Sequence, residues 1–255
     1  MSNSRAIKTA DCVGVIPARW ASTRFPGKIL TPIAGEPLLA CVIRGCQKSK
    51  RVKRWIVATD DKRIAACAEA NGAEVVMTPK SLKSGSDRAA YVSRHLKAKW
   101  IINWQGDEWS PNGRPIDLLI TALESHPDCP VATLARALDH LSAQNPNRVK
   151  VVLSQSGRAL YFSRAPIPHA ISGTEPFWLH MGAYAFERSM LERFSKWRPS
   201  PLEKRERLEQ LRLLEHDVPI AVGICRITTH GVDAPADAKE LERLIGRGRS
   251  NNRRG

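Results

Sequence analysis

Short apolar runs alternate with amphipathic stretches through the first half of the chain. The runs typical of strands lie at 13–16, 54–58, 74–77, 99–103 and 131–135. Between them, apolar residues recur at helical spacing at 36–48, 61–71, 85–97 and 114–124. Strands that alternate with helices are typical of a parallel sheet covered by helices on both faces. The pattern therefore predicts a Rossmann-like α/β fold with a mostly parallel sheet.

The pattern changes after residue 145. Two β-rich runs flank Ser156-Gly157 in "RVKVVLSQSGRALYFS", as expected for a hairpin. Helical spacing returns in "PLEKRERLEQLRLLEHD", and a strand near 220–227 and a last helix from about 235 follow. We predict one domain over residues 1–245, with a β-rich insertion at about 145–190 that is a candidate interface.

The composition fits a soluble protein. The chain has 255 residues, 42% of them hydrophobic, and its mean hydropathy is −0.32. The longest strongly apolar run, 38–43, is too short to span a bilayer, and no secretory signal is visible. The six cysteines form no C-x-x-C pair, which favours a reducing compartment. We expect a cytoplasmic protein without a membrane anchor.

The net charge of +15 raises the alternative of a polyanionic partner, including nucleic acid. Part of this excess comes from four arginines in "GRGRSNNRRG", a predicted basic disordered tail at 246–255. A non-catalytic nucleic-acid-binding protein on the same scaffold therefore stays as a remote alternative. The acidic residues described below count against it, because carboxylates facing a phosphate groove repel it unless a metal ion intervenes.

Polar residues gather where the predicted strands end. In open parallel sheets, ligands bind outside the carboxyl ends of the strands. After the first strand, "PARWASTRFPGK" supplies Arg19, Ser22, Arg24 and Lys28. It is not a Walker loop, because it holds one glycine, but arginine forks, an ammonium and a hydroxyl suit a polyphosphate. The alternative is a solvated basic loop.

Two aspartates are candidates for a divalent cation. Asp107 follows an apolar strand in "INWQGDE", and Asp233 follows the last predicted strand in "HGVD". Mg²⁺ prefers one or two carboxylates together with substrate phosphates. Either aspartate alone fits a turn or a helix cap equally well. Their pairing is therefore the specific prediction.

Two further segments carry candidate binding residues. "SGSDR" fits a helix start, and Arg88 within it is a candidate reader of a pyrimidine edge. In "HMGAYAF", alternation places His180 and Tyr184 on one side of a strand. With Glu209 and Gln210 on a predicted nearby helix, they are candidates for the wall of a polyhydroxylated-acid site. No Ser-His-Asp order, zinc-thiolate spacing or G-x-G-x-x-G is present, which lowers the prior for hydrolases, zinc enzymes and dehydrogenases.

Eight segments in order resemble the 3-deoxy-manno-octulosonate (KDO) cytidylyltransferases, or CMP-KDO synthetases. They are "IPARWASTRFPGK", "VATDD", "SGSDR", "NWQGDE", "ALYFSRAPIP", "HMGAYAF", "SPLEKRERLEQLR" and "HGVD". The resemblance implies a nucleotidyltransferase that transfers the cytidylyl group of CTP to KDO and releases pyrophosphate. It also implies a role in lipopolysaccharide synthesis and a homodimer that forms through the β-rich insertion.

The resemblance also implies residue roles. The triphosphate ligands would be Arg19, Ser22, Arg24 and Lys28, and Arg88 and Gln105 would hold the cytidine. Asp107 and Asp233 would hold Mg²⁺, and these two aspartates with Lys28 and Arg19 would be the catalytic group. The sugar acid would meet Arg164, His180, Tyr184, Glu209 and Gln210.

The chain departs from the family pattern at several positions. "HAISGTEPFWL" carries only His169 where the family often has more basic residues, Trp109 replaces a usual Pro, His230 a usual Thr, and Ser86 a common Thr. These changes leave room for another acceptor, such as 8-amino-KDO or a sialic-type acid, as the alternative substrate.

Overall fold

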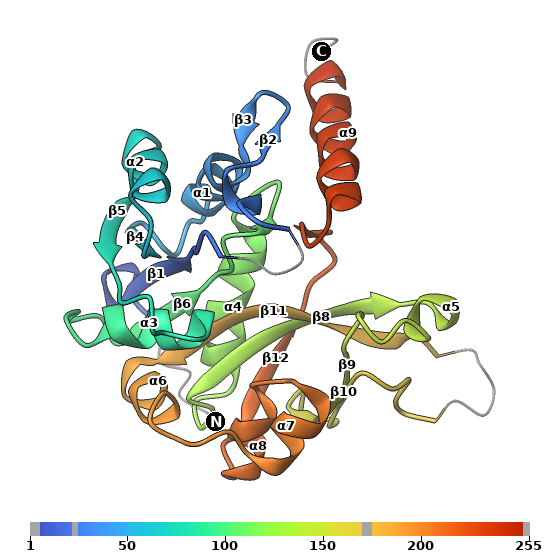
Figure 1. The fold of residues 1–255 in the computed structure, drawn as a ribbon. Coiled ribbons are helices and arrows are strands. Elements are labelled where there is room, and N and C mark those ends of the chain that lie inside the picture. The colour runs from blue at the N-terminus through green and yellow to red at the C-terminus, as the bar shows by residue number, and fades with distance from the viewer. Residues whose placement is uncertain (1–5, 22–24, 170–174, 252–255) are drawn as a thin grey trace.

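The computed structural model describes residues 6–21, 25–169 and 175–251. Within them, the centre is a sheet of nine strands with the path β10-β9-β11-β6-β1-β4-β5, off which β8 pairs with β11 and β12 pairs with β8 (Figure 1). The strands span β1 Cys12–Pro17, β4 Trp55–Thr59, β5 Glu74–Met77, β6 Trp100–Asn103, β8 Val131–Leu138, β9 Lys150–Leu153, β10 Ala159–Ser163, β11 Phe177–Glu187 and β12 Ile220–Ile224. The paired short strands β2 Pro32–Ile33 with β3 Glu36–Pro37, and β7 Glu108–Trp109 with β13 His230–Gly231, lie outside this sheet.

The sheet is parallel in its first half and mixed in its second. β1 runs parallel to β4 and β6, and β4 parallel to β5. The long strand β11 runs antiparallel to β6, β8 and β9. The α/β prediction is confirmed. The strands predicted as a β-rich insertion extend this sheet, because β9 pairs with β11 and β10 with β9.

Helices cover both faces of the sheet, and a separate apolar cluster lies beneath the helices on each face. The helices are α1 Leu38–Gln47, α2 Lys62–Ala70, α3 Gly85–Ser93, α4 Arg114–Ser125, α5 His140–Ala143, α6 Arg188–Phe194, α7 Pro201–Glu206, α8 Leu211–Glu215 and α9 Pro235–Asn251. One cluster joins the sheet to α1, α2, α4 and the start of α9, and the other joins it to α3, α6 and α8. All six residues of β1 are buried, as expected for a strand covered on both sides.

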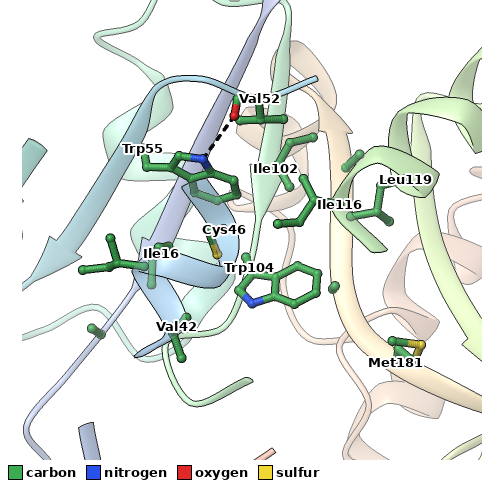
Figure 2. Close-up of a cluster of buried hydrophobic side chains, with 14 of the residues drawn as sticks. Ile16, Val42, Cys46, Val52, Trp55, Ile102, Trp104, Ile116, Leu119 and Met181 are labelled. Carbon is green, nitrogen blue, oxygen red and sulfur yellow. Dashed lines mark hydrogen bonds between the residues drawn. The ribbon is translucent and has the colours of Figure 1, made fainter. Parts of the chain in front are cut away.

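Trp104 anchors the first cluster just beyond β6 (Figure 2). It is fully buried among side chains that include Cys46, Ile116 and Met181. Its indole N–H donates to the carbonyl of Glu108 at 2.8 Å. The core thus fixes the chain that leads from β6 into the loop containing Asp107.

The helix predicted across "PLEKRERLEQLRLLEHD" is wrong in one respect, because it is broken into α7 and α8. Arg207 has a φ of 55° and ends α7 in the left-handed conformation. The Arg212 guanidinium, nearly buried, pairs with Glu203 at 2.5 Å and ties α8 back to α7. The break places Glu209 and Gln210 in a turn rather than on a helix.

The C-terminal helix is longer than the sequence predicted. α9 continues to Asn251, so residues 246–251 of the predicted disordered tail are helical. Apolar spacing alone ends near residue 245, but the arginines and serine beyond it are compatible with a helix. Residues 252–255 lie outside the described residues. No described helix is both long and apolar enough to span a bilayer.

Candidate active site

In the loop after β1, Gly27 lies close against the ring of Trp20. Gly27 has a φ of 70°, in the left-handed region that favours glycine. A Cβ atom at this position would lie 2.8 Å from the Trp20 ring. The Arg63 guanidinium stacks on the same Trp20 ring, with its central carbon 3.5 Å from the ring centroid. Trp20 therefore couples the return of the loop to helix α2.

The two cations at the ends of this loop line one cavity. Arg19 and Lys28 both border a cavity of about 240 Å³ at the carboxyl ends of β1 and β6. Arg19 also donates from Nη1 to the carbonyl of Lys83 at 3.2 Å. Ser22 and Arg24, the other predicted phosphate ligands, lie outside the described residues.

A short ribbon brings the two candidate metal ligands together. In the pairing of β7 with β13, Gly231 stands opposite Glu108. The Val232 N–H then donates to the carbonyl of Asp107 at 3.0 Å. Asp233 is the next residue, so its side chain reaches the cavity beside that of Asp107. The pairing of Asp107 with Asp233 therefore follows from backbone hydrogen bonds between segments far apart in the sequence.

Asp237 caps the turn that leads from Asp233 into α9. The carboxylate of Asp237 accepts the N–H groups of Asp233 and Ala234 at 2.9 and 2.8 Å, and so holds the turn before α9. The carboxylate of Asp233 points instead to the Lys28 ammonium, at 3.2 Å. Asp233 therefore enters this turn through its backbone N–H, and the residue lines the cavity.

Lys28 forms ion pairs with both aspartates. Its ammonium contacts Asp107 as well as Asp233. The Lys28 side chain is 11% exposed, whereas those of Asp107 and Asp233 are 28% and 56% exposed. Two carboxylates that contact one cationic nitrogen are close enough to share a small cation.

The donor set fits Mg²⁺. Carboxylate oxygens are the ligands that this ion prefers, and it usually takes one or two from the protein and the rest from water and phosphate. Among the described residues, no three His, Cys, Asp or Glu side chains form a metal cluster. Two carboxylates beside the loop predicted to bind phosphate meet that requirement.

The predicted cytidine residues lie on the other side of the cavity, where α3 begins. Arg88 and Gln105 both line it, together with Gly85. A Cβ atom on Gly85 would lie 2.9 Å from the Gln105 side-chain oxygen, so the helix start and the amide are in close contact. Arg88 is 2% exposed, and its guanidinium donates to Thr78 and, at 2.7 Å, to Asp60. Much of its hydrogen-bonding capacity therefore serves the chain itself.

His180 stands in β11 with its ring fixed by Thr133. The Thr133 hydroxyl lies 2.8 Å from the carbonyl of Ala183 and 3.0 Å from Nε2 of His180. Because a hydroxyl has one proton and donates it to the carbonyl, it accepts from Nε2–H, which assigns Nδ1 as an acceptor. Gln210 Nε2 lies 3.5 Å from Nδ1, at the limit of a hydrogen bond.

The protein around His180 keeps the imidazole neutral. Rings of Phe162 and Tyr184 enclose it, with centroids 4.9 and 5.6 Å away. Desolvation by this enclosure lowers the pKa of His180 to about 3 although part of the side chain borders a cavity. A neutral ring whose Nδ1 has only the long contact with Gln210 is suited to accept a hydrogen bond from a substrate hydroxyl.

Glu209 joins this wall from the turn between α7 and α8. Its carboxylate accepts hydrogen bonds from Ser86 and Ser84 at the start of α3, while burial raises its pKa. Burial and, to a smaller extent, the Glu209 charge also raise the pKa of Tyr184. The structure thus brings His180, Tyr184, Glu209 and Gln210 together around one face of β11.

Arg164 is engaged differently. Its guanidinium donates to the carbonyls of Glu206 at 2.8 Å and Pro146 at 3.0 Å. Its own carbonyl accepts from the buried Lys150 ammonium at 2.6 Å. These contacts connect the end of β10 to α7 and leave few donors of Arg164 for a substrate. Its role as a substrate ligand stays a prediction.

Sequence reasoning did not single out several polar residues near the site. A second cavity, of about 680 Å³, shares Asp233 with the first and is also lined by Glu108 and Arg136. Glu108 bonds to the Thr229 hydroxyl, and burial raises its pKa to about 7. Thr133 lies within an apolar run, so no local pattern marks it. Glu108, by contrast, lies in the segment "NWQGDE" next to the predicted metal ligand Asp107, so the sequence did mark its position.

Comparison with known proteins covers nearly the whole chain. The cytidylyltransferase family model matches residues 13–220. A 3-deoxy-manno-octulosonate cytidylyltransferase of Syntrophobacter fumaroxidans is 46% identical over 90% of this chain and 94% of its own length. The enzyme of the same name from Bdellovibrio bacteriovorus is 41% identical, over 91% and 97% of the two chains.

Solved structures agree. The structure of CMP:2-keto-3-deoxy-manno-octonic acid synthetase complexed with CTP superposes with a TM-score of 0.88 at 36% identity, over 93% of this chain and 99% of that one. HddC from Yersinia pseudotuberculosis shares the fold alone, with a TM-score of 0.66 at 15% identity. The chain therefore belongs to the cytidylyltransferases, in the family of the 3-deoxy-manno-octulosonate cytidylyltransferases.

Proposed function

We propose that this chain joins the cytidylyl group of CTP to KDO in a Mg²⁺-dependent reaction that releases pyrophosphate. In this reaction the anomeric hydroxyl oxygen forms a bond to the α-phosphorus of CTP. The bond from that phosphorus to the oxygen bridging to the β-phosphate breaks, and the hydroxyl proton passes to solvent. The observation that carries the proposal is the meeting of Asp107, Lys28 and Asp233 in a cavity that Arg19 and Gln105 also line.

The chain's own residues position and neutralise the triphosphate. Transfer of this kind depends mainly on alignment and on stabilising charge at the phosphate groups. Lys28 and Arg19 supply positive charge at the ends of the loop after β1. Asp107 and Asp233 would hold Mg²⁺, which when bound would neutralise phosphate charge and favour ionisation of the attacking hydroxyl.

The wall around His180 would receive the sugar acid. A polyhydroxylated substrate needs acceptors and donors in fixed places, and His180 Nδ1, Tyr184, Glu209 and Gln210 provide them on one face of β11. These groups stand beside the cavity that holds the aspartates, so a sugar hydroxyl placed here can approach a phosphate bound there.

A pyrophosphate-release assay tests the proposal. We expect turnover with CTP, Mg²⁺ and KDO, a loss of turnover when EDTA removes the metal, and lower kcat/KM with 8-amino-KDO or sialic acid. A preference for either of these acids would keep the cytidylyltransferase and replace the acceptor. No pyrophosphate with any acid would overturn the proposal.

We also infer a homodimer that uses the β-rich part of the chain. β10 lies at the end of the sheet path, and its Leu160 is 58% exposed. An exposed apolar side chain on an edge strand is a common feature of interfaces. Light scattering of the wild type and of Leu160→Lys tests this, with a dimer expected for the first and a larger monomer fraction for the second. A monomeric wild type at micromolar concentration would contradict it.

A further inference from the structure

One buried amide in the sheet has no partner in the chain. Asn103 is the last residue of β6 and is 0% exposed. Neither its side-chain oxygen nor its side-chain nitrogen forms a hydrogen bond with any described residue, although both atoms are buried. Buried polar groups in folded proteins are nearly always paired, because leaving them unpaired costs free energy. An amide with both ends unpaired therefore needs an explanation beyond packing.

The register of the sheet places this amide beside the predicted sugar-acid wall. Asn103 stands directly opposite Tyr184 in the antiparallel pairing of β6 with β11. Residues directly opposite in such a pair project to the same face with neighbouring side chains. The Tyr184 ring in turn lies 5.6 Å from that of His180. The same face of β6 is marked by Ile101, two residues earlier, which packs in the cluster under α3.

The elements above Asn103 are also polar at this end of the sheet. Helix α3 packs on β1 and β6, and its first turn presents Ser86, which donates to Glu209. Beyond the first turn, α3 contributes Ala89, Ala90 and Val92 to the shared cluster, and the two alanines are small. Two residues after Asn103 the chain reaches Gln105, which lines the cavity of the two aspartates. The amide is thus adjacent to Tyr184 of the wall across the sheet, and two residues along the chain from Gln105 of the cavity.

We propose that Asn103 binds a hydroxyl group of the sugar acid and helps to determine acceptor specificity, which rests on the proposed function. A hydroxyl both donates and accepts, and an amide offers one acceptor and two donor protons to match it. A site built to pair with a hydroxyl discriminates against acceptors that lack it, because its polar group is then left buried and unpaired.

Replacing Asn103 by leucine separates a binding role from a packing role. Leucine has the same four branched side-chain heavy atoms as asparagine and no polar atom, although its two methyl groups make it larger. If Asn103 binds the acceptor, Asn103→Leu raises the KM for KDO by about 10-fold or more and leaves the KM for CTP within about 2-fold. In the ligand-free variant, removal of an unpaired amide offsets the strain of the larger side chain, so the melting temperature should stay near that of the wild type.

A matched control lies on α3 over the same cluster. Ser93 is equally buried, but its hydroxyl donates to the Ala90 carbonyl at 2.9 Å. Ser93→Ala is expected to lower the melting temperature slightly and to leave both KM values unchanged. If Asn103→Leu does not fold, Asn103→Asp keeps the shape and removes the donor, and the same rise in the KM for KDO is expected.

The possible outcomes are distinct. An unchanged KM for KDO in a folded Asn103 variant overturns this proposal and makes the amide a structural group, satisfied by water. A rise in the KM for CTP alone overturns it in favour of a ribose contact. If the wild type itself releases no pyrophosphate from CTP and KDO, the proposed function fails instead, and the two failures cannot be confused.

Discussion

The site has two regions: a charged rim formed by Lys28, Asp107 and Asp233, and a wall around the neutral imidazole of His180. Different physical interactions hold the two regions together. At the rim, Lys28 contacts Asp107 and Asp233, and the aspartates are 28% and 56% exposed. At the wall, His180 is enclosed by aromatic rings, its pKa is low, and its tautomer is set by the buried hydroxyl of Thr133. Charge organises the first region, and hydrogen bonds around a neutral imidazole organise the second.

This difference matches two tasks. A triphosphate is a polyanion, and full charges near solvent can bind it without paying the desolvation of buried ions. A sugar hydroxyl carries no charge, and it is selected best by groups that lose a hydrogen bond when the wrong acceptor enters. We therefore expect changes at the rim to reduce turnover, and changes at the wall to alter acceptor affinity and stability.

The largest expected effect is at the rim. Asp107→Asn keeps the shape of the side chain and removes its charge, so kcat should fall by at least about 100-fold through lost stabilisation of phosphate charge. The melting temperature should change little, because Asp107 is partly exposed. Asp128→Asn is the control, since Asp128 is an exposed aspartate whose partner is Arg158. Pyrophosphate release and thermal melting measure both, and near-normal turnover of Asp107→Asn would remove the charge distinction between rim and wall.

A smaller effect is expected where the wall is fixed. Thr133→Val removes the hydroxyl that holds His180, so the ring can adopt the other tautomer or rotate. We expect the KM for KDO to rise by about 5- to 10-fold, with kcat and the KM for CTP nearly unchanged. Thr133→Ser restores the hydroxyl and should recover most of the affinity. A similar loss in both variants would assign Thr133 to packing alone.

The rim could be largely predicted from the sequence because each of its parts ends a regular element. Apolar runs marked two strands that are neighbours in the sheet; Asp107 lies shortly after β6, and Lys28 lies at the far end of the loop after β1. The meeting with Asp233 depends on a ribbon of two residues per strand, too short to show an alternating pattern. The aspartate itself was visible, but the hydrogen bonds that bring it to Asp107 were not.

The wall was harder to predict, for two physical reasons. Thr133 is one hydroxyl within a buried apolar strand, and its role depends on the pairing of β8 with β11. Glu209 and Gln210 were assigned to a helix because "LEKRERLEQLRLLE" has helical spacing throughout. The left-handed conformation of Arg207, which residues other than glycine seldom adopt, ended that helix and turned both side chains toward β11.

The smallest expected effect concerns pH and tests whether the wall is neutral. The pKa of His180 is about 3 in the folded chain, below its value of 6.5 when exposed, so protons bind the unfolded chain more tightly. The stability contributed by the neutral ring is therefore complete above pH 6.5 and is lost as the pH falls toward 3. Between pH 7 and 5, His180→Gln should lose less stability than the wild type, by roughly 1 to 2 kcal/mol.

Urea unfolding at the two pH values measures this difference. The control is His95→Gln, which removes an exposed histidine and should follow the wild type more closely than His180→Gln does. If His180→Gln and the wild type lose the same stability between pH 7 and 5, then His180 is not held neutral by its surroundings. The wall would then carry charge below pH 6.5, which erases the contrast between the two regions.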